Sequence, residues 1–319
     1  MKLEEVLIVG GSGFVGTSLA NKLAERGIRV RIPTRRRSRA GHLLLLPNAN
    51  VVEADVHDDA SLDALVAGVD AVVNLVGILH SREGKPYGAD FEQAHVRLPQ
   101  RLVAACRKHG VGRIVHVSAL GAGDDAPSGY LRSKAAGEAA IRAGEPDVAW
   151  TIVRPSVIFG PGDRFLNLFA GLLKFFPVFP VGGAGSRLQP VFVEDVTELL
   201  ATALAWPEAV GQTWDAAGPK VYTLGELIEY VGEVSDHRAL VAPLPGPVAM
   251  LQAAVLEKLP NAPLSRDNLR SLQVDNVADG PPLPFDAAPT PLETIAPLYL
   301  SPTRRKAEFF GMAARKREV

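Results

Sequence analysis

Short apolar segments alternate with longer amphipathic segments through the first half of the chain. The apolar segments are rich in β-branched residues and are typical of buried strands: Val6–Val9, Ile28–Ile32, Val51–Glu53, Ala71–Val76, Arg113–Val117 and Trp150–Val153. Between them, residues 14–26, 59–67, 90–109 and 130–143 are expected to form helices. This alternation predicts an α/β fold with a doubly wound parallel sheet, covered by helices on both faces.

The pattern changes near residue 155, where glycine and proline become frequent and helices resume only near 194–205 and 223–233. We therefore divide the chain into a sheet domain (1–155), a smaller carboxy-terminal substrate lobe (156–302) and a basic tail (303–319), leaving open that later segments return to the sheet. The aromatic, proline-broken run 172–181 is expected to lack long regular structure. It forms either a second core or an apolar cleft wall.

Composition narrows the classes of function. With 319 residues and a net charge of −1, the chain has no overall attraction to nucleic acid. The single cysteine, Cys106, excludes an internal disulfide and suits a reducing compartment, and the seven histidines show no metal-ligand spacing. No targeting segment or membrane span is expected, so the predicted location is the cytoplasm.

A glycine-rich turn follows the first predicted strand. Gly10, Gly13 and Gly16 repeat at intervals of three, in a segment that also contains Ser12, Phe14 and Val15. Glycines at this place permit a tight turn, close approach of the backbone to a pyrophosphate, and packing of strand against helix. The turn therefore predicts a Rossmann dinucleotide site, with the helix amino terminus facing the phosphates.

The end of the second predicted strand favours one cofactor over the other. A protein that binds NAD usually has a carboxylate there for the ribose 2′-hydroxyl, whereas this chain has Arg35 and Arg36. Guanidinium groups match a 2′-phosphate, so NADP(H) is preferred and NAD(H) is the alternative. A solvated basic loop without a ligand would show the same residues.

The third and fourth predicted strands end in segments that suit the same cofactor. Asp55 and Val56 follow the third strand and are candidates to flank the adenine. Leu75, Val76 and Gly77 end the fourth strand, where a glycine allows close passage beside a ribose.

A tyrosine and a lysine are spaced for acid–base chemistry. Tyr130 and Lys134 stand four residues apart in a predicted helix, which places both on one face. A neighbouring ammonium favours the phenolate, so Lys134 can lower the pKa of Tyr130 into the range of acid–base catalysis. The alternative is a half-buried tyrosine beside a surface lysine.

Together these features resemble the extended short-chain dehydrogenase/reductase superfamily, in which Tyr and Lys act with a Ser or Thr after the fifth strand. In its sugar-nucleotide epimerases the matching place here is Leu120, while Ser118 is expected to line the cofactor. The resemblance also implies that Pro155, Ser156 and Val157 contact the nicotinamide. The usual triad is therefore incomplete.

A narrower resemblance rests on five segments: His116–Leu120, Tyr130–Glu138, Arg164–Asn167, Ser265–Asn268 and Thr290–Glu293. They are similar to an atypical branch, the complex I alpha-subcomplex subunit nine-like proteins and their bacterial relatives. The resemblance implies bound NADPH and a link to quinone or respiratory chemistry, for a bacterial form without a transit segment.

Three functions follow from these observations. The first is an NADPH-binding oxidoreductase for an apolar, quinone-like or carbonyl compound, associated with a respiratory complex or the inner-membrane surface. The second is a non-catalytic subunit that holds the cofactor. The third is a sugar-nucleotide epimerase or reductase, which the apolar Leu120 disfavours.

Overall fold

The computed structural model describes residues 3–259, 262–285 and 287–302. Within it the chain forms two units. The first comprises the described chain up to Pro155 together with Val193–Ala216. The second comprises Ser156–Phe192 and the described chain from Ala217 onward. The predicted basic tail, 303–319, lies outside the described residues.

The first unit is built on a seven-stranded sheet whose neighbouring strands all pair in parallel. Its strands are β1 (Glu5–Val9), β2 (Arg29–Thr34), β3 (Ala49–Glu53), β4 (Ala71–Asn74), β5 (Arg113–Val117), β6 (Ala149–Pro155) and β11 (Gln212–Ala216). The spatial order is β11-β6-β5-β4-β1-β2-β3. This order confirms the doubly wound α/β prediction. The direction of winding reverses between β1 and β4, which is where such sheets bind ligands.

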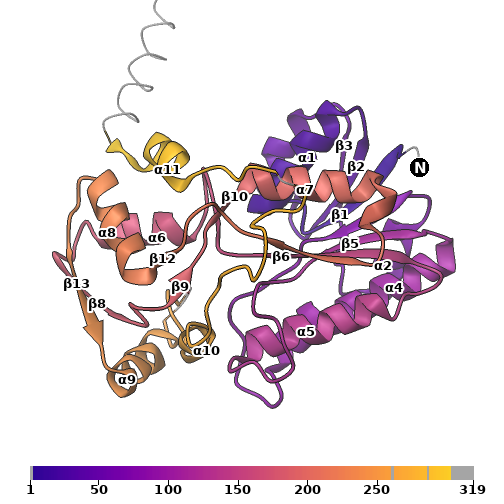
Figure 1. Ribbon diagram of the computed structural model, residues 1–319. Coiled ribbons are helices and arrows are strands. Elements are labelled where there is room, and N and C mark those ends of the chain that lie inside the picture. The colour runs from indigo at the N-terminus through magenta and orange to yellow at the C-terminus, as the bar shows by residue number, and fades with distance from the viewer. Residues whose placement is uncertain (1–2, 260–261, 286, 303–319) are drawn as a thin grey trace, which may run out of the picture. The chain divides into compact units, whose positions relative to one another are not determined.

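Helices cover both faces of this sheet (Figure 1). On one face α1 (Phe14–Glu25) packs against α7 (Val193–Ala205), and on the other α4 (Leu98–His109) packs between α2 (Asp59–Val66) and α5 (Gly129–Arg142). Two short 3₁₀ segments, η1 (Arg37–Leu45) and η3 (Pro207–Ala209), complete the unit.

The helix predicted at 90–109 is interrupted. It consists of α3 (Ala89–Phe91), a π-helical segment η2 (Glu92–Arg97) and then α4. A π-helical turn inside a helix is rare and often lies at a functional site. Hydrophobic periodicity does not reveal it, because one inserted residue leaves the pattern on either side unchanged.

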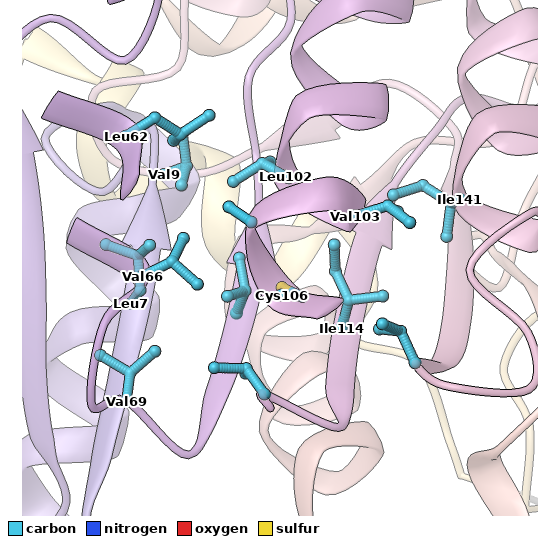
Figure 2. Close-up of a cluster of buried hydrophobic side chains, with 14 of the residues drawn as sticks. Leu7, Val9, Leu62, Val66, Val69, Leu102, Val103, Cys106, Ile114 and Ile141 are labelled. Atoms are coloured by element: carbon cyan, nitrogen blue, oxygen red, sulfur yellow. The ribbon is translucent and has the colours of Figure 1, made fainter. Parts of the chain in front are cut away.

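The core between the sheet and the second helical layer is apolar (Figure 2). Leu7 and Val9 of β1 lie opposite Leu62 of α2 and Leu102 of α4. Cys106 of α4 belongs to the same cluster and is fully buried. Burial raises the pKa of its thiol to about 12, so the residue is an unreactive packing group.

The second unit has three small two-stranded sheets and five helices within the described residues. The sheets pair β7 (Ile158–Phe159) with β10 (Val191–Phe192), β9 (Arg187–Leu188) with β12 (Tyr222–Thr223), and β8 (Val178–Gly182) with β13 (Leu240–Leu244). The helices are α6 (Phe165–Leu172), α8 (Leu224–Val234), α9 (Gly246–Leu256), α10 (Arg266–Ser271) and α11 (Leu292–Leu300). Their common core includes Phe159, Leu166 and Leu227.

The aromatic run 172–181 contains no long regular element, as predicted, but its second half lies in the short strand β8 rather than in a loop or short helix. Pro180 is tolerated there since a two-stranded sheet consists only of edge strands. Phe179 packs edge-on against Phe169, with ring centroids 5.9 Å apart, and so joins the core. Phe175 and Phe176 are instead 77% and 49% exposed. Phe179 therefore agrees with the second-core interpretation, and the cleft wall stays a prediction.

Candidate functional site

The glycine turn lies between β1 and α1, at the carboxyl edge of the sheet. Gly10 has φ +86°, a left-handed conformation that glycine adopts without strain. A Cβ on Gly16 would come within 2.5 Å of the Gly10 carbonyl oxygen, so only glycine fits there. Helix α1 begins at Phe14 with no side-chain cap and no acidic residue in its first turn. This helix end can therefore accept an anionic group.

The turn approaches the end of β4 closely. A Cβ on Gly10 would lie 3.2 Å from the Leu75 carbonyl carbon, and Leu75 N–H donates to the Val9 carbonyl oxygen (2.9 Å). Val76 N–H donates to Oδ1 of Asn74 (3.2 Å). Strand β4 ends at Asn74 rather than Val76, so Leu75, Val76 and Gly77 form the loop beside the glycine turn.

Both arginines follow directly after β2. The strand extends to Thr34, two residues beyond the predicted end, and Arg35 and Arg36 are exposed. Neither makes an ion pair within the described residues, so both guanidinium groups are available. Glu53, at the end of β3, accepts a hydrogen bond from the Arg37 backbone N–H (3.1 Å). Past β3, Asp55 Oδ1 accepts from the His57 backbone N–H (2.9 Å), and Val56 is half-buried.

Tyr130 and Lys134 lie on the first turns of α5, which Ser128 caps by accepting from Leu131 N–H (3.1 Å). Lys134 is buried, and its Nζ donates to the Val117 carbonyl oxygen at the end of β5 (2.7 Å). Burial lowers the pKa of Lys134 to about 8, while the nearby Glu138 opposes this shift. Burial also raises the pKa of Tyr130 to about 12.

The expectation that Lys134 lowers the pKa of Tyr130 is therefore wrong for the chain by itself. Removing solvent from the phenol outweighs any attraction to the ammonium. The Tyr130 phenol is accordingly protonated at neutral pH in this state.

Two further residues after β5 have different surroundings. Ser118 is buried, and its backbone N–H donates to the Val153 carbonyl oxygen (2.7 Å). Leu120 is also buried, 4% exposed, so an apolar side chain lies where the resemblance to sugar-nucleotide epimerases leads us to expect a hydroxyl.

His95 of the π-helical segment connects the β4 loop to Tyr130. Its Nε2 accepts from the Ile78 backbone N–H (3.0 Å), so Nδ1 carries the proton and donates to Oγ of Ser133 (2.8 Å). Ser133 Oγ donates to the Tyr130 carbonyl oxygen (2.7 Å), and the His95 and Tyr130 rings meet edge to face. Burial, then the charge of Lys134, lowers the pKa of His95 to about 2, so it stays neutral.

A second buried histidine lies deeper. His116 of β5 has its Nδ1 3.1 Å from Nδ2 of Asn74, the polar residue that ends β4. Burial, reinforced by the charge of Lys134, holds the pKa of His116 well below its ordinary value. Sequence reasoning did not assign either histidine to the site. One signal in the sequence could have indicated the His116 pair. Asn74 and His116 are polar residues within strands that are otherwise apolar and buried.

A buried carboxylate supports the other end of α5. Glu138 accepts from Nε and Nη2 of Arg154 on β6 (2.7 and 2.6 Å) and from Nη2 of Arg142 (2.9 Å). Although burial alone would raise it, these arginines and Ser118 hold the pKa of Glu138 below its usual value. The bidentate pair fixes the helix that carries Tyr130 and Lys134 to the sheet.

The three residues predicted to contact the nicotinamide, at the end of β6, belong to different units. Pro155 ends β6 in the first unit, and its carbonyl oxygen accepts from Leu120 N–H (3.1 Å). Ser156 and Val157 begin the second unit, where Ser156 Oγ donates to Oδ1 of Asn276 (2.6 Å) and Val157 N–H donates to the same oxygen (3.2 Å). Asn276 holds this segment, and no local signal in the sequence points to it.

Within the described residues, no group of three or more His, Cys, Asp or Glu side chains could hold a metal ion. The helices described there are also too short or too polar to cross a membrane.

Comparison with known proteins gives concordant results. Residues 6–225 match the model of the NAD dependent epimerase/dehydratase family. The chain is 33% identical over 296 residues to NADH dehydrogenase (ubiquinone) 1 alpha subcomplex subunit 9, mitochondrial, of Rattus norvegicus, covering 90% of this chain and 77% of that protein. It is 31% identical over 255 residues to the ceramide reductase of Caulobacter vibrioides, covering 79% and 77%.

A solved structure shows the same fold. The UDP-glucuronic acid 4-epimerase from Bacillus cereus, in complex with UDP-glucuronic acid and NAD, superposes with a TM-score of 0.66 at 19% identity. The match covers 85% of this chain and 98% of that one.

Proposed function

Because the chain belongs to the NAD dependent epimerase/dehydratase family, we propose that it binds NADPH and exchanges a hydride with an apolar carbonyl or quinone-type compound. One observation carries this proposal. Tyr130 and the buried Lys134 share a helix face in the unit that also contains the glycine turn, Arg35 and Arg36, and these arginines form no ion pair with any residue that the structure describes.

The residues present fit the cofactor. Gly10 and Gly16 leave a cradle that a Cβ would fill, and the uncapped start of α1 suits a pyrophosphate. Arg35 and Arg36 would hold the 2′-phosphate, with Asp55 and Val56 near the adenine. Within the first unit, Leu75–Gly77, Ser118 and Pro155 would line the rest of the cofactor site. When bound, NADPH supplies the hydride.

The chain's own residues would supply the proton. With its pKa raised to about 12, Tyr130 is protonated at neutral pH and would donate to the oxygen of a carbonyl as the carbon is reduced. Lys134 uses one ammonium proton for the Val117 carbonyl oxygen and keeps two for a ribose hydroxyl. His95 and Ser133 position the backbone of Tyr130.

The substrate class rests on relatives and on surface chemistry. The Caulobacter relative is a ceramide reductase, and ceramide is a strongly apolar compound. The buried Leu120 also replaces a hydroxyl that sugar-nucleotide epimerisation uses. In the second unit Phe175, Leu251 and Val255 are 77%, 68% and 60% exposed. Exposed apolar side chains of this size favour an apolar partner, such as a respiratory complex or the inner-membrane surface reached from the cytoplasm.

A second function is supported by the same Leu120 and by the high pKa of Tyr130. A subunit that only holds NADPH needs no hydroxyl donor and no ready phenolate. The similarity to a respiratory-complex subunit is consistent with this alternative.

Turnover distinguishes the two functions. NADPH oxidation is measured with decylubiquinone and with long-chain ketones, for the natural chain, Tyr130→Phe and the control Tyr87→Phe. We expect Tyr130→Phe to keep cofactor affinity and lose turnover, while Tyr87→Phe keeps both. Full turnover in Tyr130→Phe would reject the assigned proton donor. Tight cofactor retention with no oxidation in any variant would establish the non-catalytic function.

A further inference from the structure

A polar pocket lies in the second unit, where α6, α8 and α11 end. Its volume is about 210 Å³. Asn167 of α6, Lys174 just after that helix, and Ser235 and His237 just after α8 provide its polar lining. Ala170 and Leu300 provide apolar wall. None of the residues used for the cofactor site contributes to it.

Ser235 is the unusual member of this lining. The residue is 5% exposed, and its hydroxyl oxygen has no hydrogen-bond partner within the described chain. Leaving a buried hydroxyl unpaired costs free energy, so such groups are uncommon without a ligand. Its backbone N–H is already used, donating to the Val231 carbonyl oxygen (2.9 Å).

Three other polar side chains line the pocket beside Ser235. His237 and Asn167 are held by hydrogen bonds, and Lys174 carries a positive charge. His237 Nδ1–H donates to the Asp236 carbonyl oxygen (2.6 Å), which leaves Nε2 as a hydrogen-bond acceptor for a protonated ligand oxygen. Asn167 Nδ2 uses one proton for the Asp163 carbonyl oxygen (2.9 Å) and keeps a second. Lys174 is exposed and makes no ion pair within the described residues, so its ammonium is available to the pocket.

Lys174 brings the one formal charge to the pocket, and none of the described lining residues is a carboxylate. The carboxyl ends of α6, α8 and α11 bring partial negative charge to the same place. Three carbonyl oxygens in the last turns of α6 and α8 already accept hydrogen bonds: those of Val231 and Gly232 from the Ser235 and His237 N–H groups, and that of Phe169 from Leu173 N–H. The carboxylate of Asp163, one turn below Asn167, is occupied by the Tyr299 hydroxyl (2.6 Å).

We propose that this pocket binds a phosphoryl oxyanion, with Lys174 as the counter-charge and Ser235 and Asn167 as donors. Lysine is a common point-charge ligand of phosphate, and hydroxyl and amide donors complete such sites. The phosphoryl group belongs either to a small soluble phosphate compound or to a lipid headgroup. The inference rests only on residues of the second unit and does not depend on hydride transfer.

The test uses the full chain saturated with NADPH, so that the cofactor's own phosphate positions are filled. Inorganic phosphate is titrated while the amide NMR signals of Gly171, Ser235 and His237 are followed. We expect saturable shifts, with affinity reduced about tenfold or more in Lys174→Gln because a charged hydrogen bond is lost. The matched control Lys258→Gln removes the same charge elsewhere in the second unit. Equal weakening in both variants, or no saturable shift, overturns the proposal.

Ser235→Ala provides a readout that does not require tight binding. Without phosphate the variant should melt at a higher temperature, because an unpaired buried hydroxyl is removed. With phosphate, the natural chain should gain thermal stability and the variant should gain less. A lower melting temperature without phosphate, or an equal gain in both proteins, contradicts the assigned role of Ser235.

Vesicles identify the source of the phosphoryl group. Phosphatidylcholine vesicles with and without phosphatidic acid are compared for sedimentation of the natural chain and Lys174→Gln. Sedimentation that needs both phosphatidic acid and Lys174 assigns a lipid headgroup. Saturable binding of inorganic phosphate without sedimentation assigns a soluble phosphate compound.

Discussion

The Lys134 ammonium donates a hydrogen bond of 2.7 Å to the Val117 carbonyl oxygen, beneath the helix turn that carries Tyr130. The contact fixes a buried charge at the carboxyl end of β5. It also means that protonation of this lysine and the stability of the fold are coupled.

Lys134→Met should therefore alter how stability depends on pH. In the folded chain the pKa of Lys134 is lowered to about 8 from 10.5, so burial penalises the charged form. That penalty is complete below pH 8 and disappears as the pH rises to 10.5. At ~1.4 kcal/mol per pKa unit it amounts to about 3 kcal/mol. Urea unfolding should show the stability of the natural chain rising relative to Lys134→Met over this interval. Lys108→Met, an exposed lysine, serves as control and should show no such trend.

Two buried neutral histidines should make the protein sensitive to mild acid. The pKa values of His95 and His116 are both lowered by burial, to about 2 for His95. Below pH 6.5 the unfolded chain takes up protons that the folded chain excludes, so stability falls by ~1.4 kcal/mol per pH unit for each histidine. His116→Asn should reduce this slope by about half between pH 6 and pH 5. An unchanged slope in that variant, or a reduced one in exposed His80→Asn, would refute the explanation.

Arg35→Ala with Arg36→Ala should remove the preference for NADPH. Each charge-assisted hydrogen bond lost is worth about 1.5–3 kcal/mol, or roughly tenfold or more in affinity. Calorimetric titration with NADPH and NADH measures the preference directly. Arg29→Ala lies at the opposite end of β2 and should leave both affinities unchanged. Equal affinities for both cofactors in the natural chain would disprove the assignment of Arg35 and Arg36.

Glu138→Gln should be strongly destabilising. The substitution removes the negative charge that faces the partly buried Arg154 guanidinium, which donates to both oxygens of Glu138. Breaking a buried ion pair typically lowers stability by about 3–5 kcal/mol. Glu198→Gln is the matched control, because its pairs with Arg26 and Lys22 are at the surface and worth less than about 1 kcal/mol. Chemical unfolding of both variants is the measurement. Similar losses in the two would show that Glu138 is not a special support of α5.

The strands and helices of the first unit are predictable because each β-branched run is bounded by turn residues and each helix repeats its apolar face. Strand β11 is not predictable in this way. Gln212 and Asp215 interrupt its apolar character, and it joins the sheet only by pairing with β6, some 60 residues earlier. The glycine turn, Tyr130 and Lys134 follow from spacing along the chain.

The supporting residues of the site could not be found from local spacing. His95 reaches Ser133 across 38 residues and Ser156 reaches Asn276 across 120, so each contact exists only once the chain is folded. The sequence also could not show whether the pKa of Tyr130 is raised or lowered. That direction depends on how much solvent the fold removes from the phenol, which the four-residue spacing does not specify.

The rate at which a reagent labels Cys106 measures how often the core of the first unit opens. Cys106 is the single thiol of the chain and lies on the buried face of α4, so a thiol reagent can react only when that core exposes it. Trp150, Trp206 and Trp214, the only tryptophans, also belong to the first unit. Labelling and fluorescence therefore both follow the first unit and do not sense the second. If the second unit unfolds separately, circular dichroism will detect a transition that these two signals miss.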